Sequence, residues 1–357
     1  MSTPPADWRR WALDPPRAGG PPPARGQLKS GPADFRVEER LGFEPDGGAG
    51  HWLLQVEKTD ANTLFVARSL ARAAGGRPAD VGFAGLKDRR AVAVQWFSLP
   101  AAREPRDWQG FAGPGFRVLA AFAHSRKLRR GALAGNRFRI ALRGLEGDRA
   151  ELEARLRAVA TAGFPNYFGP QRFGRDGANL DAVAGWLAGG RLPAAREERA
   201  FILSAARALA FNAVLAARVG AGSWGRLLPG ELVNLDGSAS VFAADAIDAT
   251  LAARCEAFDL HPSGPLPGAG GLRPAAEADR VEAAALAPLA ALVDALEQAG
   301  AEAGRRPLRA RPAGFAHRLE GDVLELDFEL PRGAFATALL AECAACAVGE
   351  AGAADSG

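Results

Sequence analysis

A single aspartate lies among cations in one short polar loop of this chain. Asp88 is preceded by Lys87 and followed by two arginines, and the loop connects apolar runs at 81–84 and 92–99. Neighbouring cations favour the ionised form of a carboxyl group and lower its pKa, which keeps a nucleophile deprotonated at neutral pH. Asp88 is therefore a candidate catalytic carboxylate. The alternative is a salt-bridged aspartate that caps a turn, and loop aspartates of that kind are common.

A basic run follows further along the chain. It contains no acidic residue, and its six basic residues are Arg126, Lys127, Arg129, Arg130, Arg137 and Arg139. Guanidinium groups match the geometry of phosphate oxygens, so the run is a candidate RNA-binding surface. A solvated charged face is an equally good interpretation.

Three aromatic segments accompany the loop and the basic run. Phe138 follows Asn136 at the end of the basic run, Phe335 follows a glycine turn, and 166–174 carries three aromatics, two amides and an arginine. Each segment can supply stacking and hydrogen-bonding groups for a base. Packing in a core, or a buried hinge in the case of 166–174, is the alternative for each.

Several classes of protein are excluded by composition and motifs. The glycines of 169–174 have phosphate-loop spacing, but Arg175 and Asp176 follow where lysine and a hydroxyl residue are needed. Cys343 and Cys346 lack a second ligand pair, so we predict two buried residues on one helix face and no metal site. We expect no cofactor, no membrane span and no secretory signal. A chain with three cysteines cannot form a disulfide framework, which fits a reducing cytoplasm. The sequence has no heptad pattern or oligomer motif, so we expect a monomer.

Periodicity predicts an α+β chain of about two domains. We expect strands near 35–38, 52–56, 81–84, 92–99, 116–122, 137–142 and 323–330, and helices near 62–75, 148–162, 177–188, 196–219, 276–298 and from 334. Pro- and Gly-rich residues at 14–26 predict a flexible segment, and those at 261–268 predict a turn. A β-rich start, a helical middle and a β-rich end indicate one discontinuous domain that carries an insertion.

Taken together, these motifs identify a resemblance. The sequence resembles the TruD family of tRNA pseudouridine synthases, in family order from about residue 29 to 345. The matching segments are Asp34–Glu39, Leu41–Asp46, Ala84–Asp88, Gly131–Asn136 with Phe138, Pro165–Gly174, Leu203–Arg207 with Phe211 and Asn212, Leu266–Gly268 and Gly333–Thr337. Ala93 departs from the pattern, since the family usually has threonine two residues before the glutamine that here is Gln95.

The resemblance implies a fold and its division. The family has a pseudouridine-synthase catalytic domain, built on a curved, mixed and mainly antiparallel sheet, with an inserted α/β TRUD domain. We expect a flexible N-terminal segment at 1–28, the catalytic domain at 29–162 and 311–347, the insertion at 163–310 and a tail at 348–357.

The resemblance also implies residue roles. Asp88 matches the catalytic aspartate, Phe35, Asn136 and Phe335 match positions that contact the target uridine, and Phe138 lies beside them. Lys29 matches a family lysine that pairs with the aspartate. The implied activity is isomerisation of uridine to pseudouridine in tRNA, at uridine 13 of the D arm, without a cofactor.

Two other functions compete with this one. The first is a non-catalytic RNA-binding or remodelling protein on the same scaffold. The second is a hydrolase that acts on nucleosides, which needs a second positioned carboxylate. By sequence, Glu38 and Glu39 are the nearby candidates for that carboxylate.

Overall fold

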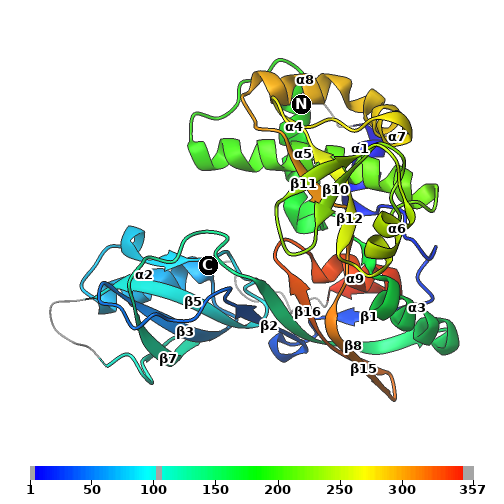
Figure 1. Cartoon of the computed structure of the whole chain (residues 1–357). Helices are drawn as coiled ribbons and strands as arrows, with labels where there is room; N and C mark the ends of the chain where they lie inside the picture. Colours follow the sequence, from blue (N-terminus) through cyan, green and yellow to red (C-terminus); the bar gives the residue numbers. More distant parts are fainter. Residues whose placement is uncertain (1–4, 102–106, 349–357) are drawn as a thin grey trace. The chain divides into compact units, whose positions relative to one another are not determined.

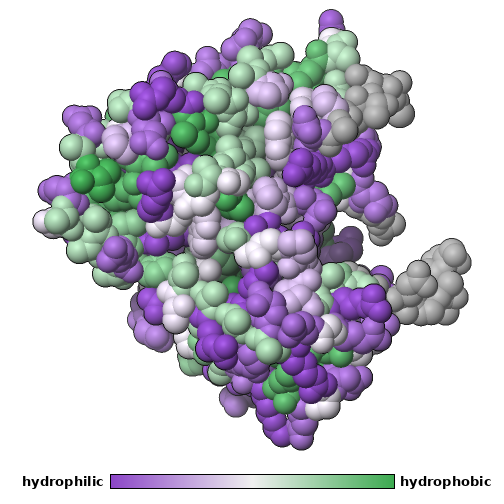
Figure 2. Space-filling view, turned by 90° about the vertical axis from the view of Figure 1, so that its right-hand side faces the viewer, coloured by the Kyte–Doolittle hydropathy of each residue, from purple (hydrophilic) through white to green (hydrophobic). Residues whose placement is uncertain are grey.

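The computed structural model of the chain describes residues 5–101 and 107–348, which form two compact units (Figure 1). Unit 1 comprises Met1–Pro22, Arg157–Arg311 and Ala334–Cys343. Unit 2 comprises Pro23–Leu156, Pro312–Gly333 and Ala344–Gly357. Over the face that Figure 2 shows, hydrophilic and hydrophobic residues are mixed.

Unit 2 is built on an open, mainly antiparallel sheet. Its main path runs β15-β16-β8-β2-β5-β3-β7-β6, and β1, β17 and β4 attach beside that path. Only β2 with β5 and β1 with β17 pair in parallel among the described strands. The strands are β1 Ala24–Leu28, β2 Phe35–Arg40, β3 His51–Thr59, β4 Gly82–Phe83, β5 Val92–Pro100, β6 Ala112–Gly113, β7 Phe116–His124, β8 Gly135–Gly147, β15 Ala313–Glu320, β16 Val323–Pro331 and β17 Ala344–Val348.

One helix covers part of this sheet and begins where the sequence predicts. Helix α2, Thr63–Ala73, is capped by Asn62, whose side-chain oxygen accepts a hydrogen bond from the backbone N–H of Leu64 at 2.8 Å. Its buried Val66 and Leu70 pack on side chains of β3 and β5. Its first residue, Thr63, contacts the 85–90 loop, so the helix and the loop are in contact beside the sheet.

Strand β8 shows how alternation separates two faces of the sheet. Phe138, Ile140 and Leu142 are buried, whereas Arg137 and Arg139 project from the opposite side. The alternation predicted for 137–142 is confirmed. The two faces carry different chemistry, one apolar and one charged.

Unit 1 surrounds one long buried helix. Its helices are α1 Ala6–Leu13, α4 Ala178–Leu187, α5 Arg196–Gly220, α6 Ala249–Glu256, α7 Ala276–Leu286, α8 Ala290–Gln298 and α9 Ala336–Cys343. Its strands β10 Glu231–Leu235, β11 Val241–Ala244, β12 Leu260–Leu266 and β13 Gly304–Pro307 form a sheet in the order β11-β10-β12-β13, and β9 Phe164–Pro165 pairs with β14 Arg309–Ala310. Helix α3, Arg149–Ala162, runs from unit 2 into unit 1.

Helix α5 is long and apolar enough to cross a membrane by length and composition alone. However, 61% of its most apolar window is buried inside the protein. A mostly buried core helix can have the same length and composition, so these two properties of α5 are weak evidence for a membrane span.

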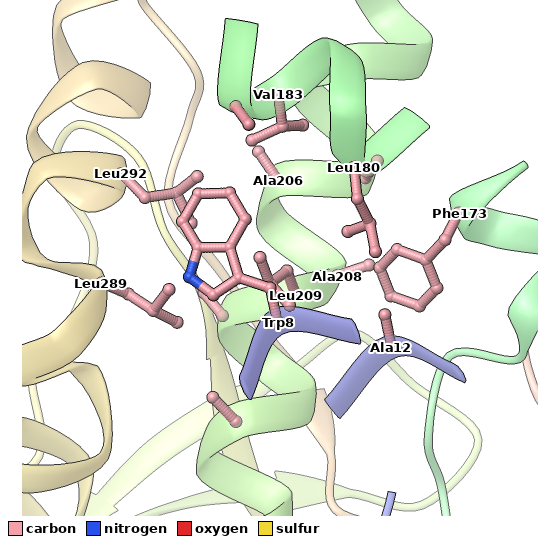
Figure 3. Close-up of a cluster of buried hydrophobic side chains, with 14 of the residues drawn as sticks. Trp8, Ala12, Phe173, Leu180, Val183, Ala206, Ala208, Leu209, Leu289 and Leu292 are labelled. Atoms are coloured by element: carbon pink, nitrogen blue, oxygen red, sulfur yellow. The ribbon is translucent and has the colours of Figure 1, made fainter. Parts of the chain in front are cut away.

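The prediction of a flexible segment over 1–28 is wrong in two places. Residues 6–13 form α1, and Figure 3 shows Trp8 among Leu209, Leu289 and Leu292 in the core of unit 1. Residues 24–28 form β1, which pairs with β17 and β8. Burial of apolar side chains on α1 offsets the entropy that a flexible segment would keep.

Three further expectations need correction. Residues 260–266 form the buried strand β12 and not a turn. The expected helix over 276–298 breaks at Ala287–Leu289, because Pro288 has no backbone N–H to continue it. Cys343 ends α9 whereas Cys346 lies in β17, so the two cysteines do not share a helix face.

The domain division stays a prediction. The chain leaves unit 2 at Leu156 and returns at Pro312, close to the expected changes after 162 and 310. Residues 334–343 pack with unit 1, whereas we expected them in the catalytic domain. Val348 is the last residue of β17, and the rest of the expected tail lies outside the described residues.

Candidate active site

The loop that carries Asp88 is anchored by buried polar side chains of unit 2. The Gln95 side chain donates from Nε2 to the carbonyl oxygen of Gly85 at 2.6 Å, and the Thr63 hydroxyl accepts from the backbone N–H of Lys87 at 3.1 Å. Thr63 also donates to the Gln95 side-chain oxygen at 3.1 Å. Both side chains are at least 99% buried, since Gln95 is 0% and Thr63 1% exposed. The loop is therefore held by β5 and by the first turn of α2.

Lys58 supports the same loop from β3. Its side chain is 0% exposed, and its ammonium donates to the carbonyl oxygens of Asp88 at 2.7 Å and Ala61 at 2.8 Å. Burial lowers the pKa of Lys58 to about 8, although the nearby Asp88 opposes this change. A buried cation thus holds the backbone of the aspartate and leaves the carboxylate to other partners.

Among the described residues the carboxylate of Asp88 has two hydrogen-bond partners, and it stays accessible. Its Oδ2 accepts from the ammonium of Lys29 in an ion pair, and its Oδ1 accepts from the backbone N–H of Arg90 at 3.1 Å. The Lys29 side chain is 10% exposed and that of Asp88 is 40% exposed. Lys29 has a positive φ of 60°, an uncommon conformation for a residue with a side chain. The pairing of Lys29 with Asp88 that the resemblance implies is present.

An apolar wall lies next to this ion pair. The Lys29 ammonium is 4.4 Å from the centre of the Phe35 ring, and Phe35 meets Phe138 edge-to-face at 6.0 Å. Phe138 in turn stacks on Phe328 at 5.5 Å. Asn136 lies on the Phe138 side of β8, and its Oδ1 is buried without a hydrogen-bond partner within the part of the chain that is described. Unit 2 therefore brings Asp88, Lys29, Phe35, Phe138 and Asn136 to one face of its sheet.

The second carboxylate near the loop is already occupied. Glu39 is 1% exposed, and it accepts from the Lys87 ammonium at 2.6 Å and from the backbone N–H of Trp96 at 2.9 Å. Lys87, although next to Asp88 in the chain, therefore pairs with Glu39. Asp88, unlike Glu39, is therefore an accessible carboxylate.

The basic run is divided by the sheet. Arg137 and Arg139 lie on the face opposite Phe138, where both bind Asp327, Arg137 at 2.8 Å and Arg139 at 3.2 Å. The other four lie in the exposed segment between β7 and β8: Arg126, Lys127, Arg129 and Arg130. Lys127 donates to the carbonyl oxygen of Ala79 at 2.6 Å, and the Arg130 guanidinium lies 4.3 Å from the centre of the Phe83 ring. The run is thus two surfaces and not one.

Phe335 belongs to unit 1. It is half-buried at the start of α9 and lies 6.1 Å from Phe168. A Cβ atom at Gly169 would come within 2.7 Å of the Thr337 hydroxyl and 2.8 Å of the Gln171 side-chain oxygen, so these side chains would have to move. Tyr167 and Phe173 are buried in unit 1, and burial raises the pKa of Tyr167. In the 166–174 segment, only Phe168 has an aromatic face beside Phe335.

Sequence reasoning missed Lys58, Thr63 and Gln95. One signal was present: the chain has only four lysines, and three of them, Lys29, Lys58 and Lys87, contact or belong to the Asp88 loop. No group of three or more His, Cys, Asp or Glu residues within 5–101 and 107–348 is placed to hold a metal ion.

Comparisons with known proteins identify the family of the chain and its fold. The family model described as tRNA pseudouridine synthase D (TruD) matches residues 20–198 and 195–343. The tRNA pseudouridine synthase D of Methylococcus capsulatus is 47% identical over 92% of this chain and 94% of that protein. That of Nitrosococcus oceani is 47% identical over 91% and 92%. The crystal structure of the putative tRNA pseudouridine synthase D of Methanosarcina mazei has the same fold, with a TM-score of 0.68 at 19% identity over 94% of this chain and 96% of that one.

Proposed function

The chain belongs to the TruD family of tRNA pseudouridine synthases and isomerises uridine to pseudouridine in tRNA, and we propose that Asp88 is its catalytic residue and uridine 13 of the D arm its target. The accessible carboxylate of Asp88, ion-paired with Lys29 beside the Phe35 ring, carries the first part of the proposal. The position of the target rests on the family resemblance.

The reaction breaks the bond between N1 of uracil and C1′ of ribose and joins C5 to C1′. No atom is gained or lost and the reaction involves no net oxidation or reduction, so we propose that the chain acts without a nucleotide cofactor. The sequence has no heptad pattern or oligomer motif, and we propose that the chain acts as a monomer. The reaction needs a carboxylate near C1′ and C6, which is the proposed role of Asp88. It also needs a pocket that holds the detached base while it turns.

The apolar wall suits that second requirement. Stacking of a base on an aromatic ring contributes about 1–3 kcal/mol and does not fix the angle of the base within its plane. Phe35 and Phe138 are 7% and 8% exposed, so in the proposal they form the apolar floor against which the base packs. The Oδ1 of Asn136, which has no hydrogen-bond partner among the described residues, can accept a hydrogen bond from a uracil N–H. These residues bind the base in the proposal. For Phe335, contact with the target uridine rests on the family resemblance.

The positions of Glu38 and Glu39 argue against hydrolysis. Glu38 pairs with Arg40 at 3.0 Å and is in register with Arg137, on the sheet face opposite Phe138. A glycosidic hydrolase uses a second carboxylate to activate water. The Glu39 oxygens accept from Lys87 and from the Trp96 backbone, so they are not available for that role. An RNA-remodelling protein would not need an accessible carboxylate facing an anionic ligand.

The test is tritium release from tRNA transcribed with C5-tritiated uridine, followed by mapping of the modified position. Asp88→Asn should fold and bind tRNA but release tritium at least about a hundredfold more slowly, because the amide cannot act as a carboxylate. Turnover by Asp88→Asn within about tenfold of the natural protein would contradict the assignment. A product mapped away from uridine 13 would contradict the position alone.

A further inference from the structure

Unit 2 has a groove that is separate from the Asp88 carboxylate. Its volume is about 670 Å³, within the range of small-molecule sites. It lies beside the ends of β3 and β7, and its lining includes Phe43, His124, Ser125, Arg126, Lys127 and Arg129. None of these residues has a role in the isomerisation as argued above, although three belong to the basic run.

An aromatic platform forms one wall of this groove. The Phe43 ring stacks nearly parallel on the His124 ring, with centres 5.2 Å apart and planes 17° apart. His124 is 7% exposed and lies below the surface, whereas Phe43 is 37% exposed. One face of a flat ring is therefore supported by the protein, and the residue remains open to a ligand.

The loop that carries Phe43 is fixed in place. Asp46 accepts from the backbone N–H groups of Gly48 at 3.0 Å and Ser125 at 2.8 Å, and from the Ser125 hydroxyl. A side chain at position 48 would come within 2.9 Å of Ser125, so glycine is needed there. Although Asp46 and Glu44 line the groove, the oxygens of Asp46 serve these loop contacts. The platform costs little ordering entropy when a ligand binds.

Two cations of the groove have no competing partner. Arg126 and Arg129 are exposed, and neither forms an ion pair with any residue in 5–101 or 107–348. The same segment reaches the Asp88 loop, because the backbone N–H of Gly131 donates to the carbonyl oxygen of Ala84 at 2.7 Å. A strand of RNA that follows this segment would pass from the loop to the groove.

We propose that this groove binds one unstacked nucleotide of the tRNA, with its base on Phe43 and its neighbouring phosphates on Arg126 and Arg129. A flat aromatic ring beside free guanidinium groups is the combination that single-stranded nucleic acid requires. The proposal rests on the proposed function, since the RNA is the substrate of the Asp88 site. It adds a second point of attachment outside that site.

The two parts of the groove have different signatures in binding measurements. Phe43→Ala should raise the Kd for a tRNA transcript about five- to tenfold or more, with an unchanged dependence on salt, because stacking releases no counterions. The double variant Arg126→Ala, Arg129→Ala should lower the slope of log K against log salt concentration by about 1.4, or about 0.7 for each lost phosphate contact on a single strand. Filter binding at four salt concentrations measures both.

Controls separate these effects from misfolding. Phe43→Leu keeps an apolar contact with His124 but removes the flat ring, and it should match Phe43→Ala in affinity. Leu119→Ala changes an apolar residue of β7 with the same 37% exposure and should leave the Kd unchanged.

The proposal is overturned if folded Phe43→Ala and Phe43→Leu both bind tRNA within twofold of the natural protein. It is also overturned if the double arginine variant keeps the natural salt slope. Tritium release by the natural protein is measured in parallel. Its loss would contradict the proposed function, whereas normal release with unchanged binding by the variants contradicts only the groove.

Discussion

Lys58 is the least expected residue of the candidate site, because among the described residues its fully buried ammonium donates only to backbone carbonyl oxygens. It donates to Asp88 and Ala61 while its pKa falls to about 8. A lysine suits this place better than an arginine, since a compact ammonium fits where a planar guanidinium would need more room and more acceptors. The Lys29 ammonium also has little space, since its side chain is 10% exposed and lies between Asp88 and the Phe35 ring.

The buried Lys58 predicts a specific pH dependence of stability. Its pKa is 10.5 in the unfolded chain and about 8 in the folded protein, so the folded state binds fewer protons between these values. The cost of burying the ammonium, about 3 kcal/mol, is fully present below pH 8 and disappears as the pH rises toward 10.5. The free energy of unfolding of the natural protein, minus that of Lys58→Met, should therefore increase by about 3 kcal/mol from pH 7 to pH 10.5.

Urea unfolding at several pH values measures this difference, and every titration that the two proteins share cancels in it. Gln55→Ala changes no titratable group, and its difference from the natural protein should not vary with pH. A flat difference for Lys58→Met over the same range would show that Lys58 is not a buried cation.

The Asp88 loop is positioned by β5 and α2. Gln95 contacts both the loop and Thr63 of the helix. Gln95→Ala leaves the Gly85 carbonyl oxygen without its donor and removes the contact with Thr63. We expect the loop to shift, with kcat about 10- to 100-fold lower, because small displacements of a reacting group reduce the rate strongly.

The KM of Gln95→Ala for tRNA should stay within about twofold, since the groups proposed to bind RNA are unchanged. Gln55, a strand glutamine of β3 that forms no side-chain hydrogen bond with the described residues, offers the matched control. Gln55→Ala should keep kcat within twofold. If Gln95→Ala raised KM and left kcat unchanged, Gln95 would not position the loop.

Elements with a clear period were predictable from the sequence, and elements with proline and glycine were not. Val323–Pro331 alternates apolar and acidic residues and is the strand it predicts. Leu260–Leu266 contains two prolines and a glycine, yet it is a strand because it pairs with β10 over 260–262 and with β13 over 263–266. Each half pairs on one side, so a missing N–H is tolerated. Gly264 is needed because Leu308 and Phe211 press against it.

The candidate site was predictable to a similar extent. The resemblance supplied Asp88, Lys29, Phe35 and Asn136, and unit 2 brings these residues to one face. Local patterns did not indicate Lys58 or Gln95, since their partners are backbone atoms 30 and 10 residues away. A contact of that kind depends on strand register, which no single window of sequence specifies.

Unit 1 is assembled from three separate stretches of the chain. Helix α1 packs against α4, α5 and α8, which follow more than 160 residues later. The Arg9 guanidinium binds Asp181 at 3.0 Å, and the Asn212 side chain donates to the Trp11 carbonyl oxygen at 2.9 Å. The first residues of the chain therefore complete a core that the sequence pattern alone assigned to a flexible segment.

Trp8 gives this arrangement a measurable consequence. Its indole is 7% exposed within the core of unit 1, so Trp8→Ala should lower the free energy of unfolding by about 3 kcal/mol or more through lost burial and the cavity left behind. Arg10→Ala, an exposed change on the same helix, should stay within about 0.5 kcal/mol. Hydrogen exchange followed by mass spectrometry should show the faster opening in α1, α4, α5 and α8 and not in the sheet of unit 2. Equal acceleration in both units would mean that they unfold as one body, and no acceleration would mean that α1 is not part of the core in solution.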